Sequence, residues 1–283
     1  MLHLANISKS YKRGALVAVD GLTLEVREGE VFGLLGPNGA GKSTTIGIAV
    51  GLTMPDSGTV VLGDMGPPTG GPARRALGVA PQSLAVYDEL SGEENLRFFG
   101  RLYGLGGKAL EGRVEEMLEL SGLSDRRGDR VSGYSGGMKR RLNIASALLH
   151  NPRMLMLDEP TVGVDPQSRN AIFDQIESMR ARGLTVLYTT HYMEEAQRLC
   201  NRVGIIDRGR LLAVDTPDAL IDRYGGDSTL TIDGDRGQES MKTKDPARDV
   251  ASALARGGVR GVRIDRPNLE TVFLSLTGRS LRD

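Results

Sequence analysis

A glycine-rich segment at residues 36–44 has the composition and spacing of a chemical site. Its glycines let consecutive backbone N–H groups converge on phosphate oxygens, because no side chain obstructs them. Lys42 adds a cation for the β- and γ-phosphates, and the Ser43 hydroxyl is a ligand for Mg²⁺. The apolar run 31–35 precedes the segment and a helical pattern follows it, as a phosphate loop requires. The predicted nucleoside triphosphate loop comprises Gly36, Pro37, Asn38, Gly39, Ala40, Gly41, Lys42, Ser43 and Thr44.

Two adjacent carboxylates, Asp158 and Glu159, follow a second apolar run at residues 154–157. Ligands of α/β sheets bind beyond the carboxyl ends of the strands, so this pair is expected beside the phosphate loop. Asp158 would hold Mg²⁺, since hard cations prefer oxygen ligands. Glu159 would act as general base toward the attacking water, a role that contributes about 10²–10⁴-fold to a rate. The pair therefore predicts hydrolysis of the bound nucleotide.

The tripeptide Ser135-Gly136-Gly137, called the signature loop below, has the composition of a second anion site. It precedes a stretch with helical apolar spacing, so it would form the helix N-terminus. Free backbone N–H groups and a serine hydroxyl at such an end can bind an anion. Because the chain already has one phosphate loop, this site raises the question of whose phosphate it binds.

The elements that position these residues follow the rhythm of an α/β fold with a mainly parallel sheet. Short apolar runs that alternate with helical patterns occur at residues 31–35, 77–80, 154–157, 185–188 and 203–206. Short strands of a small antiparallel layer are expected at residues 2–7, 22–26 and 59–62. Residues 83–133 are mostly helical in pattern, with a glycine-rich break at 104–107. After residue 216 the sequence becomes polar, and it ends in a predicted helix at 269–276 capped by Asn268.

Composition narrows the function classes. The chain of 283 residues has 36 basic and 36 acidic residues, which argues against a nucleic-acid binder with a broad basic surface. Its one cysteine, Cys200, excludes an internal disulfide framework and is expected to be buried. No apolar run approaches 18 residues and no signal pattern opens the chain, so we expect a soluble cytoplasmic protein.

The phosphate loop, the signature loop and the acidic pair, in this order and spacing, resemble the ATP-binding subunits of ATP-binding cassette (ABC) transporters. The resemblance extends over about residues 8–209. It implies a P-loop NTPase core with an inserted helical subdomain, ATP and Mg²⁺ as ligands, and ATP hydrolysis coupled to transmembrane transport. It also implies that the signature loop closes on ATP held by an opposite subunit, so that two chains sandwich two nucleotides head to tail. The partner chain would be a second copy or a related cassette subunit.

The resemblance assigns roles to four further residues. Tyr11, expected before the first strand pair, matches the aromatic that stacks on adenine, and Gln82 matches the glutamine that reaches Mg²⁺ and the attacking water. Asp165 matches the aspartate of the dimer-contacting loop, and His191 matches the histidine that hydrogen-bonds the γ-phosphate. Residues 1–218 would form the ATPase domain, with its helical subdomain at about 83–150. Residues 219–283 would form an accessory extension whose fold the sequence does not predict.

Within the family, the sequence resembles bacterial drug exporters of the daunorubicin-resistance type. Tyr134 and Met138 replace the commonest leucine and glutamine around the signature loop, and the tail at residues 267–274 is also similar. This resemblance implies export of a drug, antibiotic or other small amphipathic molecule through a separately encoded membrane permease. The chain would then lie on the cytoplasmic face of the membrane. Apolar residues just after Gln82 are expected either to contact the permease or to pack the helical subdomain: Leu84, Val86, Tyr87 and Leu90.

Three alternatives fit the sequence less well. A cassette protein that acts on ribosomes or DNA would normally show two cassettes, a long coiled-coil insertion or a strongly basic arm, and this sequence shows none of them. A regulatory partner that does not hydrolyse ATP would be expected to lack Glu159, His191 or the signature loop, and all are present. A P-loop kinase or a small GTPase would not explain the signature loop.

Overall fold

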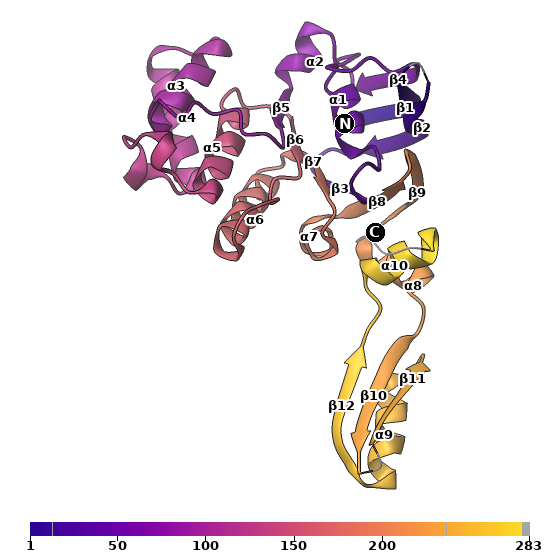
Figure 1. Ribbon diagram of the computed structural model, residues 1–283. Helices are drawn as coiled ribbons and strands as arrows, with labels where there is room; N and C mark the ends of the chain where they lie inside the picture. Colours follow the sequence, from indigo (N-terminus) through magenta and orange to yellow (C-terminus); the bar gives the residue numbers. More distant parts are fainter. Residues whose placement is uncertain (13, 236, 279–283) are drawn as a thin grey trace. The chain divides into compact units, whose positions relative to one another are not determined.

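The structure of the chain is a computed structural model that describes residues 1–12, 14–235 and 237–278 (Figure 1). It divides the chain into two compact units, Met1–Val214 and Asp215–Asp283. We call them the N-terminal unit and the C-terminal unit. Each is described by itself.

A six-stranded sheet in the order β5-β6-β7-β3-β8-β9 forms the centre of the N-terminal unit. Its strands are β3 (Val31–Leu35), β5 (Leu77–Ala80), β6 (Met154–Asp158), β7 (Thr185–Thr190), β8 (Arg202–Asp207) and β9 (Arg210–Asp215). The first five strands in the sheet order pair in parallel. Every residue of β3, β6 and β7 is buried, as expected where a parallel sheet is covered on both faces. The predicted mainly parallel sheet is confirmed.

Helices return the chain from the carboxyl edge of this sheet to its amino edge. They are α1 (Lys42–Ala49) after β3, α6 (Pro166–Ala181) after β6 and α7 (Met193–Leu199) after β7, with a short α2 (Gly71–Arg75) before β5. Because α1, α6 and α7 begin at the carboxyl edge, their N-termini face the ligand side of the sheet. None of the described helices has the length and apolar character that crossing a membrane requires.

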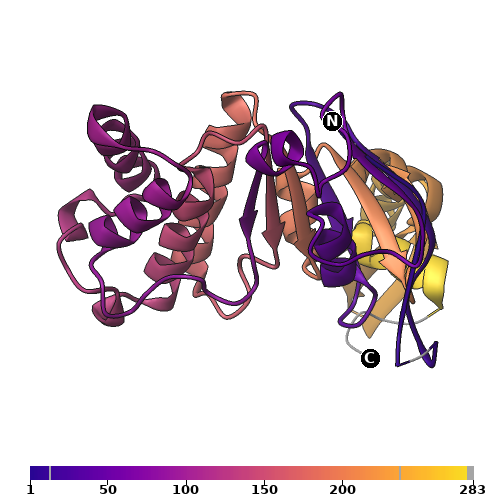
Figure 2. The ribbon, with the colours of Figure 1, turned by 90° about the horizontal axis from the view of Figure 1, so that it is seen from above.

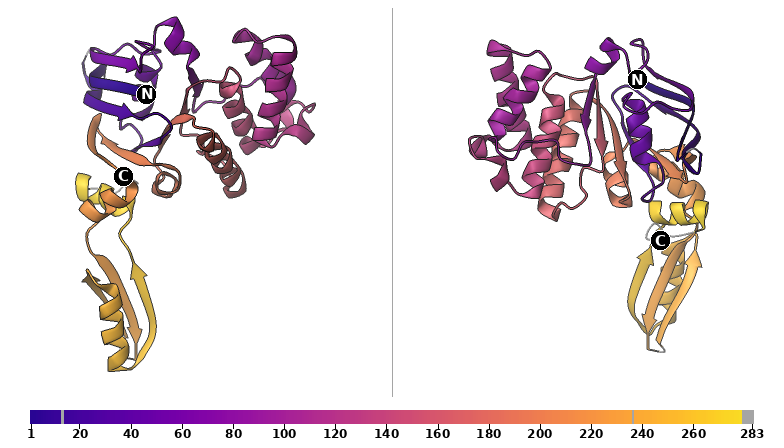
Figure 3. Two further views of the ribbon diagram at one scale, coloured as in Figure 1. Left: turned by 180° about the vertical axis from the view of Figure 1, so that it is seen from behind. Right: turned by 45° about the horizontal axis from the view of Figure 1, so that its top comes forward.

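An antiparallel sheet of three strands, β2-β1-β4, packs beside the core. Its strands are β1 (Leu2–Tyr11), β2 (Leu16–Val26) and β4 (Ser57–Leu62), drawn at the indigo end of the colour scale in Figure 3. Leu2, Leu4 and Ile7 of β1 belong to one buried cluster with Phe32 of β3. The predicted layer is confirmed. Tyr11, however, is the last residue of β1 and pairs with Leu16, so it lies within the first strand pair and not before it.

The helical subdomain consists of α3 (Gly92–Leu102), α4 (Gly107–Ser121), the 3₁₀ turns η1 (Ser124–Arg126) and η2 (Val131–Gly133), and α5 (Gly136–Leu148). Its helices form a layer beside the parallel sheet, purple to magenta in Figure 2. Ser91 and Glu94 form a capping box that fixes the start of α3. The predicted glycine-rich break separates α3 from α4, and Gly104 adopts a φ of +83° there.

The C-terminal unit contains the part of the fold that the sequence did not predict. Its elements are α8 (Pro217–Tyr224), β10 (Ser228–Gly234), β11 (Gly237–Thr243), α9 (Pro246–Arg256), β12 (Val259–Asp265) and α10 (Leu269–Thr277). The strands form an antiparallel sheet, β11-β10-β12, and Ala253 of α9 packs on Leu230 and Ile232 of β10. The helix α10, whose Asn268 forms a capping box, confirms the predicted terminal helix and its cap.

Candidate nucleotide site

The carboxyl edge of the parallel sheet brings together four segments that are distant in the sequence. The strand β3 leads into the phosphate loop, β6 ends at Asp158, β5 leads toward Gln82, and β7 leads into His191. Because parallel strands end at a common edge, their following residues can form one ligand site. The structure therefore supplies the arrangement that the sequence pattern predicts for these segments.

A cavity of about 340 Å³ opens at this edge. From the predicted set it is lined by Tyr11, Asn38, Gly39, Gly41, Lys42, Ser43, Thr44, Gln82 and Glu159. Leu16, Val17 and Ala18 of β2 also line it, and sequence reasoning did not identify them. Leu16 and Val17 are about half exposed, so they offer apolar surface to a flat ring beside Tyr11.

Close backbone approach explains two of the glycines in the phosphate loop. A Cβ atom on Gly36 would lie 2.2 Å from the carbonyl oxygen of Ile206, and one on Gly41 would lie 2.3 Å from that of Ala18. Gly41 also has a φ of +106°, which favours glycine. No side chain caps the N-terminus of α1, so its first N–H groups can bind an anion.

Lys42 and Glu159 form a buried ion pair in the floor of the cavity. The Lys42 ammonium lies 2.9 Å from a Glu159 carboxylate oxygen and donates hydrogen bonds of 2.7 and 2.9 Å to the carbonyls of Gly36 and Pro37. Glu159 has a φ of +45°, a left-handed conformation that residues with a side chain rarely adopt. Such backbone strain is concentrated at functional sites. The carboxylate is therefore held in a specific position next to the phosphate loop.

Asp158 and His191 stand beside Glu159 without lining the cavity themselves. The Thr189 hydroxyl donates a 2.8 Å hydrogen bond to the Asp158 carboxylate and accepts one of 3.0 Å from the backbone N–H of Glu159. The Nδ1 atom of His191 is 3.4 Å from a carboxylate oxygen of Glu159. The three predicted residues at the ends of β6 and β7 are thus brought together.

The oxygen atoms that the chain offers at this edge of the sheet suit a magnesium ion. Ser43 offers a hydroxyl, Gln82 an amide oxygen and Asp158 a carboxylate, and Mg²⁺ prefers oxygen ligands of this kind. Magnesium in nucleotide sites is typically held by one or two carboxylates together with phosphates of the substrate. The chemistry of the residues present therefore fits the ion that the sequence predicts.

The signature loop lies at the start of α5, apart from the phosphate loop. The Ser135 hydroxyl caps this helix by accepting a 3.2 Å hydrogen bond from the N–H of Met138. A Cβ atom on Gly137 would lie 2.2 Å from the Ser168 side chain, so α5 and the start of α6 approach closely. Asp165 caps α6 by accepting from the N–H of Ser168 at 2.9 Å, a hydrogen bond that lowers the pKa of the Asp165 carboxyl. None of residues 135–137 lines the cavity at the phosphate loop.

Two residues around the signature loop have structural contacts that the sequence does not reveal. Tyr134 is buried in the helical subdomain, where its hydroxyl donates to the carbonyl of Arg126 at 2.7 Å. Arg140 donates to the carbonyls of Pro81 and Gln82 at 2.9 and 2.7 Å, and burial lowers its pKa. The guanidinium of Arg140 therefore fastens the Gln82 segment to the helix that begins at the signature loop.

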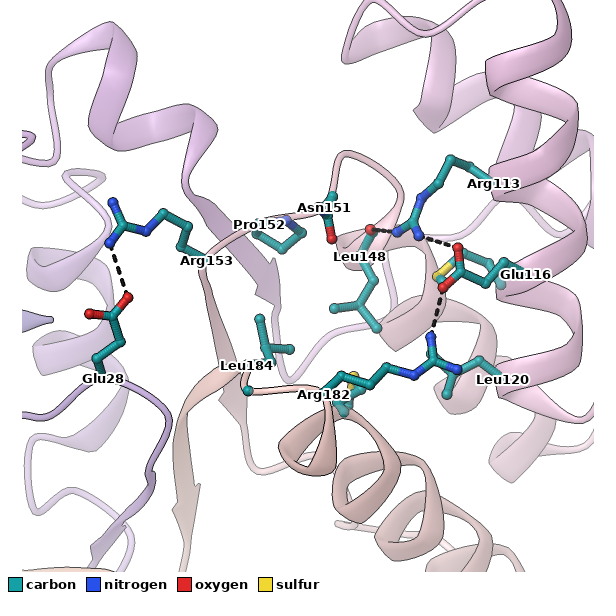
Figure 4. Close-up of a pocket in the computed structure, with 13 residues that line it drawn as sticks. Glu28, Arg113, Glu116, Leu120, Leu148, Asn151, Pro152, Arg153, Arg182 and Leu184 are labelled. Carbon is teal, nitrogen blue, oxygen red and sulfur yellow. Dashed lines mark hydrogen bonds and ion pairs between the residues drawn. The ribbon is translucent and has the colours of Figure 1, made fainter.

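A second cavity, of about 180 Å³, lies at the opposite, amino edge of the sheet (Figure 4). Glu116 on α4 forms ion pairs with Arg113 and Arg182, and the Arg182 contact is 2.7 Å. Arg113 also donates to the carbonyl of Leu148 near the end of α5. These contacts join the helical subdomain to the end of α6. None of the predicted site residues lines this cavity. It therefore lies at the contact between the helical subdomain and α6 and is not part of the nucleotide site.

Comparisons with known proteins agree with this geometry. A sequence profile of the family described as ABC transporter matches residues 19–162. The linearmycin resistance ATP-binding protein LnrL of Bacillus subtilis is 41% identical over 314 residues, covering all of both chains. The Nod factor export ATP-binding protein I of Cupriavidus metallidurans is 43% identical over 304 residues, covering 100% of this chain and 99% of that protein.

Solved structures show the same fold. An ATP-binding subunit of an ABC transporter superposes with a TM-score of 0.70 at 32% identity, covering 80% of this chain and 93% of that one. A dimeric ATP-binding cassette in a post-hydrolysis state, bound to ADP and phosphate, superposes with a TM-score of 0.69 at 26% identity, covering 76% and 98%. The predicted P-loop NTPase fold is confirmed. This chain belongs to the ABC transporter family, as an ATP-binding subunit whose ATPase activity is coupled to transport.

Proposed function

We propose that the chain powers export of a drug, antibiotic or other small amphipathic molecule through a separate membrane permease. Two chains would sandwich two Mg-ATP head to tail on the cytoplasmic face of the membrane. The names of the two relatives, one for linearmycin resistance and one for Nod factor export, support the export role because both match this chain over its whole length.

The position of the signature loop is the main observation in favour of a nucleotide sandwiched between two chains. It is a capped helix start with Ser135 and Gly136 exposed, and it does not line the cavity at the chain's own phosphate loop. An exposed anion site of this kind can serve a nucleotide held by another chain. The similar cassette that was solved as a dimer bound to ADP and phosphate supports the pairing of two chains.

Within one site, the residues divide the chemistry as follows. The phosphate loop and Lys42 bind the phosphates, while Tyr11 stacks on the adenine. Ser43, Gln82 and Asp158 would hold Mg²⁺, which neutralises phosphate charge when bound. Glu159 takes a proton from the attacking water.

The ion pair between Lys42 and Glu159 implies that the γ-phosphate binds before Glu159 can activate the water. A bound γ-phosphate competes for the Lys42 ammonium, and its arrival frees the Glu159 carboxylate for the water. His191, 3.4 Å from Glu159, hydrogen-bonds the γ-phosphate, and Asp165 contacts the second chain.

Replacing Lys42 with alanine tests the phosphate-binding role. We expect ATP affinity to fall by about 10–100-fold, since a hydrogen bond to a charged group is worth about 1.5–3 kcal/mol. A direct binding titration measures this, with Lys108→Ala as control because Lys108 is exposed on α4. Equal affinity of Lys42→Ala and the unchanged chain would rule out the assignment.

An apolar patch on the helical subdomain is the proposed contact for the permease. Leu84, Tyr87 and Phe98 are exposed, and the rings of Tyr87 and Phe98 meet edge to face at 5.0 Å. Val86 and Leu90, also predicted for this surface, are half-buried. An amphipathic cytoplasmic helix of the permease could place its apolar face here.

The double variant Leu84→Ala, Tyr87→Ala tests this contact. We expect it to abolish co-purification with the membrane protein encoded by the neighbouring gene and to abolish ATP-driven export, while ATP binding is unchanged. Leu52→Ala is the control, since Leu52 is an exposed leucine of the N-terminal unit outside this patch. Full export by the double variant would place the contact elsewhere.

A further inference from the structure

A buried carboxylate, Glu195 on α7, follows His191 by four residues and has no role in the site described above. It is only 2% exposed. One carboxylate oxygen accepts hydrogen bonds from the Tyr188 hydroxyl at 2.8 Å and the Thr190 hydroxyl at 2.7 Å. Desolvating a carboxylate costs several kcal/mol, and apolar side chains can often fill such a space without loss of stability. Stability alone therefore does not account for a glutamate at this position.

The Thr190 hydroxyl links Glu195 to the backbone on both sides of His191. Besides donating to Glu195, it accepts a 2.9 Å hydrogen bond from the N–H of Tyr192. The Thr190 carbonyl accepts a 3.3 Å hydrogen bond from Gly36 in the phosphate loop. His191 lies between these two fixed residues. The carboxylate thus orients the hydroxyl that fixes the His191 segment.

Tyr188 gives the same carboxylate a second attachment to β7. It is completely buried, and burial, together with the nearby Glu195 charge, raises its pKa well above the ordinary value. The phenol therefore keeps its proton and remains a hydrogen-bond donor. Tyr188 pairs in register with Leu157, directly before Asp158. The contact anchors Glu195 to the centre of the sheet.

The other oxygen of Glu195 faces α6. It lies 3.7 Å from the Nε atom of Arg169, and neither of these two buried atoms has a hydrogen-bond partner. The Arg169 guanidinium lies 5.1 Å from the centre of the Tyr192 ring, and that ring lies 4.1 Å from the His191 ring. The backbone N–H of Arg169 donates to the carbonyl of Asp165 at 2.9 Å. Arg169 therefore connects the start of α6 with the His191 segment.

We propose that Glu195 is a positioning residue for His191, and that the Glu195–Arg169 pair ties the orientation of His191 to the helix that Asp165 caps. The proposal rests on the role of His191 proposed above. When a second chain contacts the Asp165 loop, a shift of α6 by less than about 1 Å would bring Arg169 and Glu195 to hydrogen-bond distance. One carboxylate then transmits closure of the dimer to His191.

The variant Glu195→Gln tests the positioning role in the full chain, by steady-state ATP hydrolysis. Glutamine keeps the size and one acceptor oxygen but removes the charge. We expect kcat to fall by about 10–100-fold, as misplacement of a group near the reaction does, with the KM for ATP unchanged. Glu194→Gln, on the exposed face of the same helix, is the matched control and should retain the full rate.

Combination with His191→Ala separates positioning from a general structural effect. If Glu195 acts through His191, adding Glu195→Gln to His191→Ala changes kcat by no more than about twofold. A structural effect would instead multiply with that of His191→Ala. Arg169→Met should show the same pattern. It provides the test if Glu195→Gln lowers the melting temperature too far to be assayed.

The outcomes distinguish the two proposals. If His191→Ala hydrolyses ATP at the full rate, the proposed role of His191 is wrong, and the inference fails with it. If His191→Ala is impaired while Glu195→Gln is not, only the inference is overturned. It is also overturned if the Glu195→Gln or Arg169→Met effect keeps its full size in the His191→Ala background.

Discussion

Replacing Glu159 with glutamine is expected to lower steady-state ATP hydrolysis by about 10²–10⁴-fold, the usual contribution of a general base. The amide preserves the shape of the side chain but cannot accept a proton from the water. Binding should persist, because the variant removes the carboxylate that pairs with Lys42 at 2.9 Å and leaves that ammonium available to phosphate. Phosphate release and a binding titration measure the two effects separately.

The matched control for this variant is Glu28→Gln. Glu28 lies at the amino edge of the sheet and pairs with Arg153 at 3.0 Å, away from the nucleotide cavity. We expect it to hydrolyse ATP at the full rate. Hydrolysis by Glu159→Gln at more than about a tenth of that rate would be too fast for a chain that has lost its general base.

Replacing Ser135 with arginine is expected to lower hydrolysis by about 10²-fold or more, comparable to losing a preorganised donor that faces developing charge. The arginine removes the helix-capping hydroxyl and places a long side chain over the exposed helix start that we propose binds the anion. ATP binding to the single chain should be unchanged, because Ser135 does not line the cavity at the phosphate loop. Lowered hydrolysis together with unchanged ATP binding would show that Ser135 acts on the nucleotide of another chain and not on that of its own chain.

Ser132→Arg is the control for the added bulk and charge. Ser132 is exposed and lies three residues before Ser135, outside the signature loop. It should hydrolyse ATP normally. A Ser135→Arg chain that binds ATP much more weakly than the unchanged chain would show that the loop acts within its own chain.

The core of the fold could be predicted because its local signals agree with its tertiary environment. The strand β6 is apolar in sequence because both faces of the sheet are covered, and a strand of this kind ends at the site. The phosphate loop is recognisable in the sequence because the backbone geometry requires glycine at Gly36 and Gly41. In these segments the residue types alone carry enough information to place the element and its ligand.

Other features of the fold could not be predicted, because they depend on contacts between segments that are distant in the sequence. In α7, Glu194 and Glu195 are adjacent residues of the same type, so the sequence does not distinguish them. The first is exposed, whereas the second is buried against Tyr188 and Thr190. Arg140 follows the signature loop, and only the fold shows that it reaches the Gln82 segment. From the sequence alone, Glu195 and Arg140 would be expected to be solvent-exposed charged residues, because their buried partners belong to other elements.

The fold of the C-terminal sheet escapes prediction for a different reason. Its sheet buries few apolar residues, chiefly Leu230 and Ile232 under α9. Nearly every residue of β11 is exposed, so the strand shows no apolar alternation. The helix α10, with a buried Phe273 and a cap at Asn268, has a strong local signal. This contrast explains why the terminal helix was predicted and the sheet before it was not.

The central claim, that each nucleotide is held by Lys42 of one chain and Ser135 of another, can be tested by sedimentation. The samples are Lys42→Ala and Ser135→Arg chains, each also carrying Glu159→Gln, with saturating Mg-ATP. ATP that binds only the closed pair drives association by mass action. We predict that each sample alone stays monomeric and that their equal mixture forms dimers with one intact composite site. The account is contradicted if the mixture stays monomeric while Glu159→Gln alone dimerises, or if Ser135→Arg dimerises by itself.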